Sequence, residues 1–362
     1  MPEIGERFLV VRLGSLGDIV HTFPAVAALR ESFPTAKITW LTHPRWAALV
    51  ASSGLASEIW AAETRSLGSL RAVIGRIRGA RFTCAIDYQG LWKSAGLPFL
   101  AGVARRVGFS GETIREWGVP VLYTERVRCA RTHIAEQNGE LSVRAGAKCF
   151  AADFSLRVAE EDAIFVAETL RAAGVGDGGY VLLSPGGGWR SKCWPAKRFG
   201  ELAREIYRGM GLPCVVNYGP GEEWLVEEVK RSAGDASPVG FRGEMGKLTA
   251  AARGALCMVG GDTGPLHLAV ALGTASVSVY GPTDPARNGP YPGFVLKDGC
   301  GGEDGLVGAE GSRNRNTVFR VATAVRDHSR VDETDAAMLK ISVEDVFGAV
   351  REMVAHVVGS RA

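Results

Sequence analysis

One local pattern restricts the fold of this chain more than any other: a short apolar segment, then a glycine-rich turn, then a helix. It begins at Phe8–Leu13, recurs at Tyr180–Leu183, and is most complete at Ala255–Val259, which leads into Gly260–Gly273 and a further apolar run at Ala275–Tyr280. Short apolar runs between turn signals are typical of buried strands. Strands that alternate with helices predict an α/β fold, with a parallel sheet covered by helices on both faces.

The length of 362 residues allows two domains, each with its own core. A glycine-rich joint follows the helix that ends near residue 173, so we expect an N-terminal Rossmann-like domain at 1–173 and a C-terminal one at 174–340. A last helix at 341–362 could pack back on the N-terminal domain. Residues 298–335 are polar and glycine-rich without a clear period, and are expected to form a long surface excursion.

The composition is that of a soluble globular protein, with 46% hydrophobic and 22% charged residues. The sequence contains no apolar run long enough for a membrane span, and Phe8–Val11 is too short for a signal peptide, which predicts a cytoplasmic protein. Seven scattered cysteines without a C-x-x-C pair argue against a disulfide framework or a zinc site.

Charge is unevenly distributed along the chain. Residues 1–150 hold 19 Lys and Arg against 12 Asp and Glu, a net +7, and residues 151–362 hold 23 against 27, a net −4. An anionic partner is therefore expected at the first half.

The stretch Gly260–Gly273 has the features of an anion site. Asp262 or Thr263 can cap the helix, and the glycines let a ligand approach the backbone. A helix start with free amides, a hydroxyl and little side-chain bulk commonly binds phosphate. An ordinary capped helix between two strands is the alternative, but the flanking glycines, His267 within one turn and the later loop Gly281–Pro285 favour a ligand site.

Two loops of the first half follow predicted strands. Gly14–Asp18 is expected to lead into a helix from Ile19 to Glu31. This loop lacks the third glycine of the dinucleotide fingerprint, and Asp18 either caps the helix or serves a function. Asp87–Ser94 follows a strand end, where open α/β sheets bind ligands. The later basic run Arg126–His133, taken alone, would be a solvated surface.

A basic amphipathic helix is predicted between these loops. Such a helix usually packs on its own sheet, and a role at a membrane surface is the alternative. Its apolar face consists of Leu67, Leu70, Val73, Ile74 and Ile77, flanked by Arg71, Arg78 and Arg81.

Taken together, five segments in a fixed order resemble glycosyltransferase family 9, the ADP-heptose:lipopolysaccharide heptosyltransferases. They are Gly14-Ser-Leu-Gly17-Asp18, Asp87-x-Gln89-Gly90-x-x-Lys93-Ser94, Lys192-Cys-Trp194-Pro195, Gly260-Gly-Asp262-Thr-Gly264-Pro-x-His267 and Tyr280-Gly-Pro-Thr-Asp284-Pro. The second segment is most similar to heptosyltransferase I. The resemblance implies a GT-B fold, two Rossmann-like domains facing across a cleft, with the donor on the second domain and the acceptor on the first.

The resemblance also implies roles for single residues in an inverting transfer. Asp18 would take the acceptor proton as general base. Lys192 and the helix start at Thr263–Gly264 would stabilise charge on the leaving diphosphate, and Glu222 would bind the ribose. The implied donor-binding residues are Glu222, Asp262, Thr263, Gly264, Pro265, Leu266 and His267. The implied acceptor-binding residues are Lys93, Ser94, Arg126 and Arg65.

The implied substrates are ADP-heptose and an anionic, Kdo-bearing lipid A precursor, met by a peripheral, monomeric enzyme at the inner face of the membrane. No nucleic acid partner and no cofactor is expected, and the absence of D-x-D, H-E-x-x-H and P-loop motifs predicts that no metal is needed. Three alternatives stay open: a heptosyltransferase II-like or other family 9 transferase with a different acceptor, a non-catalytic ADP-sugar binding module, and an NAD-dependent oxidoreductase, which the broken fingerprint disfavours.

Overall fold

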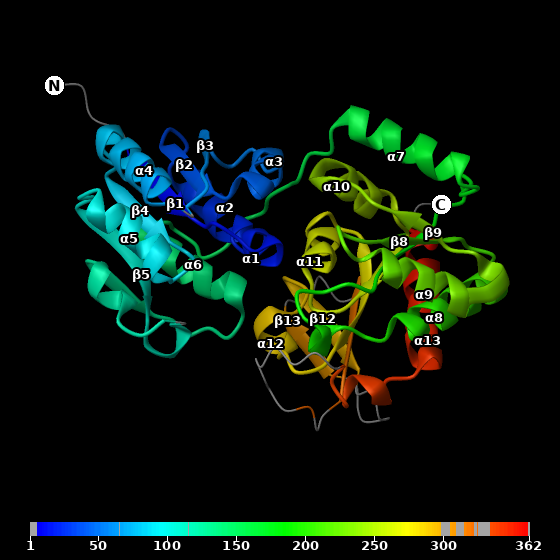
Figure 1. Cartoon of the computed structure of the whole chain (residues 1–362). Coiled ribbons are helices and arrows are strands. Elements are labelled where there is room, and N and C mark those ends of the chain that lie inside the picture. Colours follow the sequence, from blue (N-terminus) through cyan, green and yellow to red (C-terminus); the bar gives the residue numbers. More distant parts are fainter. Residues whose placement is uncertain are drawn as a thin grey trace. The chain divides into compact units, whose positions relative to one another are not determined.

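The computed structural model describes residues 6–64, 66–114, 116–297, 305–308, 315–321, 324 and 334–360. The chain forms two compact units, Met1–Arg157 and Val158–Ala362 (Figure 1). Each unit is a largely parallel sheet with helices on both faces, which confirms the predicted α/β class with two Rossmann-like domains.

The described part of the first unit has six parallel strands in the order β3-β2-β1-β4-β5-β6. They are β1 (Arg7–Val11), β2 (Lys37–Thr42), β3 (Glu58–Ala61), β4 (Cys84–Asp87), β5 (Arg105–Ser110) and β6 (Glu125–Arg128). The helices are α1 (Leu16–Val20), α2 (Phe23–Ser32), α3 (Ala47–Ser52), α4 (Leu67–Ala80), α5 (Trp92–Leu100) and α6 (Ile134–Ala145). This strand order is that of a Rossmann domain.

Both faces of this sheet are buried, because neighbouring residues of β1 point to different helices. Leu9 lies in a cluster with Val73 of α4 and Leu97 of α5. Phe8, on the opposite face, has its ring 5.1 Å from that of Phe33, the residue directly after α2. The basic helix α4 therefore packs on its own sheet, as expected for most helices of this kind.

The helix predicted from Ile19 to Glu31 is interrupted, and the prediction is wrong at this point. Two residues that belong to neither helix, His21 and Thr22, separate α1 from α2. Pro24 lies in the first turn of α2, where its missing N–H is tolerated, whereas inside a continuous helix it would remove a hydrogen bond.

Eight strands form the described sheet of the second unit, in the order β13-β12-β14-β11-β10-β7-β8-β9, all parallel except the β12–β13 pair. They are β7 (Val181–Ser184), β8 (Cys214–Asn217), β9 (Val239–Phe241), β10 (Cys257–Gly260), β11 (Ala275–Tyr280), β12 (Gly293–Lys297), β13 (Gly305–Gly308) and β14 (Asn316–Arg320). The helices are α7 (Glu160–Ala172), α8 (Ala196–Met210), α9 (Glu223–Ala233), α10 (Met245–Gly254), α11 (Gly264–Ala271), α12 (Pro285–Asn288) and α13 (Val343–Gly359). None of the helices in the described ranges is long and apolar enough to cross a bilayer.

The C-terminal helix packs within the second unit. Val350 of α13, Phe199 of α8 and Val229 of α9 share one buried cluster with Val181 and Val259 of the sheet, and α13 lies beside α8 (Figure 1). The sequence allowed this helix to return to the first domain, but its apolar face is already used against α8 and the second sheet.

The boundary between the units lies before α7, at 157/158, and not after it at 173/174 as predicted. Helix α7 packs against α10 of the second unit, where the Lys247 ammonium lies 3.8 Å from the centre of the Phe165 ring. The glycine-rich joint after residue 173 is therefore a connection inside the second unit, between α7 and β7.

The prediction of a surface excursion at 298–335 is wrong for its described central part. Asn316–Arg320 forms β14, which pairs with β11 and β12, and its Val318 is fully buried. The apolar run here is very short, so periodicity alone did not reveal a strand. Much of the rest of 298–335 lies outside the described residues.

Candidate active site

Each sheet has a point where the strand order reverses: between β1 and β4 in the first unit, and between β7 and β10 in the second. The loops after such strands diverge and leave a crevice at their carboxyl ends, where open α/β sheets bind ligands. The predicted site loops Gly14–Asp18, Asp87–Ser94 and Gly260–His267 each follow one of these four strands.

Asp18 lies in the first turn of α1 and has two neighbours that hold its carboxylate. Its Oδ2 accepts hydrogen bonds from the amide (3.1 Å) and the hydroxyl (3.0 Å) of Ser15, the N-cap residue. Its Oδ1 lies 2.6 Å from Nη2 of Arg12, and the Asp18 side chain keeps 21% of its surface exposed. The carboxylate is therefore both a capping-box partner and an ion-pair partner, and it stays within reach of solvent.

Arg12 was not singled out from the sequence, although it lies within the first strand pattern, Phe8–Leu13. Its side chain is buried, and besides Asp18 its guanidinium contacts the carbonyl oxygen of Tyr88 after β4. A second link between the same loops is the hydrogen bond from the Leu13 amide to Gln89 Oε1, at 2.7 Å. Because these bonds connect the loops after β1 and β4, the predicted loops Gly14–Asp18 and Asp87–Ser94 form one side of the candidate site.

Asp87 ends β4 and is fully buried. It accepts hydrogen bonds from the hydroxyls of Tyr123 (2.7 Å) and Ser94 (2.8 Å) and from the amides of Gln89 and Gly90. Burial raises the pKa of Asp87 above its ordinary value, and these donors oppose that rise. The buried Asp87 carboxylate thus fixes the conformation of the loop that follows β4.

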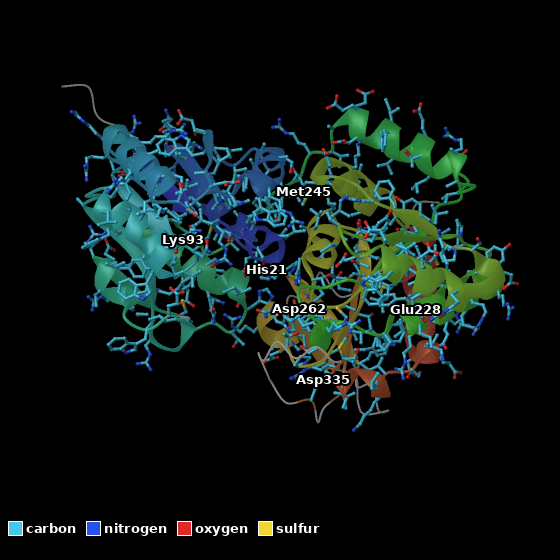
Figure 2. All side chains as sticks on the ribbon, viewed as in Figure 1. His21, Lys93, Glu228, Met245, Asp262 and Asp335 are labelled. Atoms are coloured by element: carbon cyan, nitrogen blue, oxygen red, sulfur yellow. The ribbon has the colours of Figure 1, made fainter. Side chains whose placement is uncertain are left out.

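The predicted acceptor residues are placed differently from one another. Ser94 is buried and its hydroxyl is used by Asp87 and the Leu91 backbone, so it shapes the loop and does not face an acceptor. Lys93 is exposed at the start of α5 (Figure 2). Arg126 is exposed on β6, the edge strand that the sequence presented as a solvated basic run. Arg65 lies outside the described residues.

In the second unit, Lys192 and His267 meet at Asp262, which lies two residues after the end of β10 (Figure 2). Its Oδ2 lies 2.6 Å from Lys192 Nζ, and its Oδ1 lies 3.0 Å from His267 Nε2. The side chains of Lys192 and Asp262 are only 11% and 7% exposed. Lys192 also lies 4.2 Å from the centre of the Trp189 ring, so a nearly buried cation is fixed beside the start of α11.

Burial alone would raise the pKa of Asp262, but the His267 hydrogen bond and the Lys192 charge outweigh it and hold that pKa well below its ordinary range. Asp262 therefore stays ionised at neutral pH and keeps its two partners in place. Among the described residues, no group of three or more His, Cys, Asp or Glu is placed to hold a metal ion.

Thr263 is the N-cap residue of α11, but its side chain makes no capping hydrogen bond. Its buried Oγ1 has no hydrogen-bond partner among the described residues. Gly264 and Pro265 are half-buried in the first turn, whereas Leu266 is fully buried in the core and supports the fold instead of facing a ligand. The start of α11 thus offers a hydroxyl and amides that its own fold leaves free for an anion.

Glycines allow the strand-end loops of the second unit to approach closely. A Cβ on Gly186, after β7, would lie 2.6 Å from Glu222 Oε1, and one on Gly261 would lie 2.6 Å from the Lys192 carbonyl oxygen. Glu222, whose Oε2 accepts from the Gly219 amide at 2.7 Å, is thereby held against the β7 loop. The three loops after β7, β8 and β10 therefore lie against one another, the β7 loop through Gly186 beside Glu222 and the β10 loop through Gly261 beside Lys192.

Known proteins of one family are similar to this chain in sequence and in fold. The model of glycosyltransferase family 9 (heptosyltransferase) matches residues 70–293. Lipopolysaccharide heptosyltransferase 1 of Pseudomonas aeruginosa is 28% identical over 300 residues, which cover 79% of this chain and 81% of the relative, and the Escherichia coli K12 protein of that name is 28% identical over 79% and 91%. The structure of E. coli ADP-heptose lps heptosyltransferase II has a TM-score of 0.77 at 17% identity, over 98% of this chain and 100% of the other. This last likeness shows the fold alone.

Proposed function

Because the chain belongs to glycosyltransferase family 9, the heptosyltransferase family, we propose that it transfers heptose from ADP-heptose to the Kdo region of a lipid A precursor in lipopolysaccharide inner-core synthesis. The chain is a glycosyltransferase, and its two Rossmann-like units are those of the GT-B fold. The finer proposal is carried by one observation: Lys192 is held by Asp262 beside the unpaired start of α11.

The donor diphosphate fits this place on the second unit. The helix start supplies amides and the Thr263 hydroxyl, and the Lys192 cation adds a charge that is already positioned before the reaction. Glu222, at the end of the β8 loop, can accept hydrogen bonds from ribose hydroxyls. These groups favour the transition state because negative charge grows on the leaving diphosphate as the sugar departs.

The transfer itself is a single displacement. An acceptor hydroxyl attacks the anomeric carbon, the bond from that carbon to the diphosphate oxygen breaks with its electron pair, and ADP leaves with inversion at the carbon. Asp18 takes the proton of the acceptor hydroxyl. The ion pair with Arg12, at 2.6 Å, holds the Asp18 carboxylate in position before the acceptor arrives.

The acceptor belongs to the first unit in this proposal. Residues 1–157 hold 20 Lys and Arg and 13 Asp and Glu, a net +7, and Lys93 and Arg126 are exposed there. Sugar carboxylates and phosphates of a Kdo-bearing lipid would pair with such cations. We propose that the enzyme acts as a monomer at the inner face of the membrane, in peripheral contact with it.

The test begins with the donor. A thermal-shift panel of ADP-heptose and GDP-, UDP- and dTDP-sugars should show the largest stabilisation with ADP-heptose. Turnover of ADP-heptose should then require a soluble Kdo-lipid analogue. Donor binding without turnover for any inner-core acceptor would leave the non-catalytic binding module, and turnover only with an already heptosylated acceptor would leave the heptosyltransferase II-like alternative.

The first prediction concerns metals. Activity should be the same after treatment with EDTA, because Lys192 and the start of α11 provide the positive charge that the diphosphate needs. Initial rates with and without the chelator, and after addition of Mg²⁺ or Mn²⁺, are the measurement. A rate that depends on either cation would contradict this account of the diphosphate site.

A further inference from the structure

Large apolar side chains are exposed together over α5 and the segment that follows β5. Trp117 is 95% exposed, and Trp92, Phe99, Leu100 and Val121 are each more than 40% exposed. We call these five residues the α5 patch. Single exposed apolar residues are ordinary, but a cluster that includes two tryptophans indicates a binding surface.

The α5 patch is one continuous surface. Trp92 Nε1 donates a hydrogen bond to the Trp117 carbonyl oxygen at 3.2 Å, and a Cβ on Gly118 would lie 2.9 Å from the Trp92 ring. The short helix η3 (Val119–Leu122), which carries Val121, contacts α5. Phe99 and Leu100 lie two turns after Trp92 on the same face of α5.

Cations border this apolar surface. The Arg106 guanidinium lies 5.4 Å from the centre of the Phe99 ring, and Arg78 donates a hydrogen bond to the Leu100 carbonyl oxygen at 2.8 Å. Lys93 is exposed next to Trp92. The Glu116 carboxylate accepts a hydrogen bond from the Trp92 amide at the start of α5, where a negative charge is favourable.

We propose that the α5 patch binds the surface of an anionic phospholipid bilayer. Tryptophan and phenylalanine with bordering arginine and lysine form the combination that suits the interface, because the rings enter the headgroup region while the cations pair with lipid phosphates. The net charge of +7 in residues 1–157 complements such a surface. This inference rests on the proposed function, because the proposed lipid acceptor is the reason for this enzyme to meet a bilayer.

Binding through this surface also orients the site. Helix α5 begins after the short loop that follows Asp87, and its exposed face continues from Lys93 towards Leu100. A bilayer held against α5 would therefore adjoin the acceptor loop of the first unit, and a lipid-anchored acceptor would reach this loop without leaving the membrane.

The test is co-sedimentation of the full chain with phosphatidylglycerol or phosphatidylcholine vesicles. The wild-type protein should bind the anionic vesicles and release them at high salt. Trp117→Ser combined with Leu100→Ser should lower the partition coefficient about tenfold or more, because both side chains leave the interface. Trp224→Ser is the matched control, since Trp224 is 51% exposed on the second unit, and it should leave binding unchanged.

A transfer assay separates this inference from the proposed function. The double variant should keep wild-type kcat and KM with a soluble Kdo-lipid analogue, but should lose activity on acceptor embedded in vesicles. Equal binding of the double variant and Trp224→Ser to anionic vesicles would overturn the membrane role of the α5 patch, whatever the soluble assay shows. A change of sedimentation coefficient from dimer to monomer in the double variant would assign the patch to a second copy of the chain and would also overturn it.

Discussion

At the scale of single residues, Asp18 is held both by its own helix and by Arg12, and the two possible roles of its carboxylate have different consequences. As a capping partner it contributes about 1 kcal/mol to the stability of α1. As a general base it would contribute a factor of about a hundred or more to the rate.

Asp18→Asn should therefore lower kcat about a hundredfold or more and leave ADP affinity nearly unchanged, because the amide keeps the size of the side chain but accepts no proton. Steady-state rates and ADP titration are the measurements. Ser15→Ala is the control, since it removes the cap but keeps the carboxylate, and it should cost about 1 kcal/mol of stability with most of the activity retained. Nearly full activity in Asp18→Asn would mean that the base lies elsewhere.

Asp262 permits a prediction about pH. Its pKa is depressed in the folded state, so its ionised form contributes stability above the ordinary aspartate pKa of about 3.9, and this contribution is lost as pH falls from there towards the folded pKa. Asp262→Asn leaves Lys192 unpaired in a nearly buried place and should cost about 3 kcal/mol at pH 7. Urea unfolding of both proteins at pH 7 and pH 3 should show the difference shrinking at the lower pH. If the difference in unfolding free energy is the same at both pH values, the charge of the Asp262 carboxylate is not the source of the stabilisation.

At the scale of elements, the proposed donor surface depends on how closely the loops after β7, β8 and β10 approach one another. Gly186 and Gly261 are the contact points, and a methyl group would meet different obstacles at each. At Gly186 it would meet the end of the flexible Glu222 side chain, whereas at Gly261 it would meet the backbone carbonyl of Lys192.

Gly186→Ala should therefore move the Glu222 carboxylate and raise the donor KM several-fold, with little change in Tm. Gly261→Ala should displace the loop that carries Lys192, lowering Tm by several degrees along with donor affinity. Thermal unfolding and ADP titration of the two variants check this pair. If both lose stability equally, the β7 loop is as rigid as the β10 loop and the expected difference is absent.

At the scale of the whole molecule, the two units differ in charge and in the kind of site at their carboxyl edges. The net charge is +7 for residues 1–157 and −4 for residues 158–362, and the buried Lys192–Asp262–His267 cluster belongs to the second unit. The proposed function assigns the acceptor to the first unit and the donor to the second.

Replacement of Lys93 and Arg126 by glutamine should raise the acceptor KM about tenfold or more and leave the donor constant in place, because a hydrogen bond to a charged group contributes about 1.5 to 3 kcal/mol. Kinetics with each substrate varied in turn are the measurement. Lys148→Gln, which removes the same charge from another exposed position of the first unit, is the control. A change of the donor constant alone would reverse the assignment of the units.

The sequence by itself determined the α/β class, the two-domain plan and the loops that follow the switch-point strands. These features depend on local patterns: apolar runs such as Phe8–Leu13 and the glycine turn before α11 specify strand, turn and helix within a few residues. The residues Lys192, Asp262 and His267 could be grouped beforehand because they stand in motifs of a known family.

Tertiary structure alone decided which of these residues face a ligand and which support the fold. Ser94 stands next to Lys93 in the same motif, yet it is buried, because its hydroxyl is one of the four donors that hold the buried Asp87 carboxylate. The role of Arg12 in linking two loops follows only from the pairing of β1 with β4, because this pairing brings the Tyr88 carbonyl to the Arg12 side chain. The boundary at 157/158, the strand β14 and the packing of α13 likewise depend on contacts between segments far apart in sequence, and local patterns do not specify such contacts.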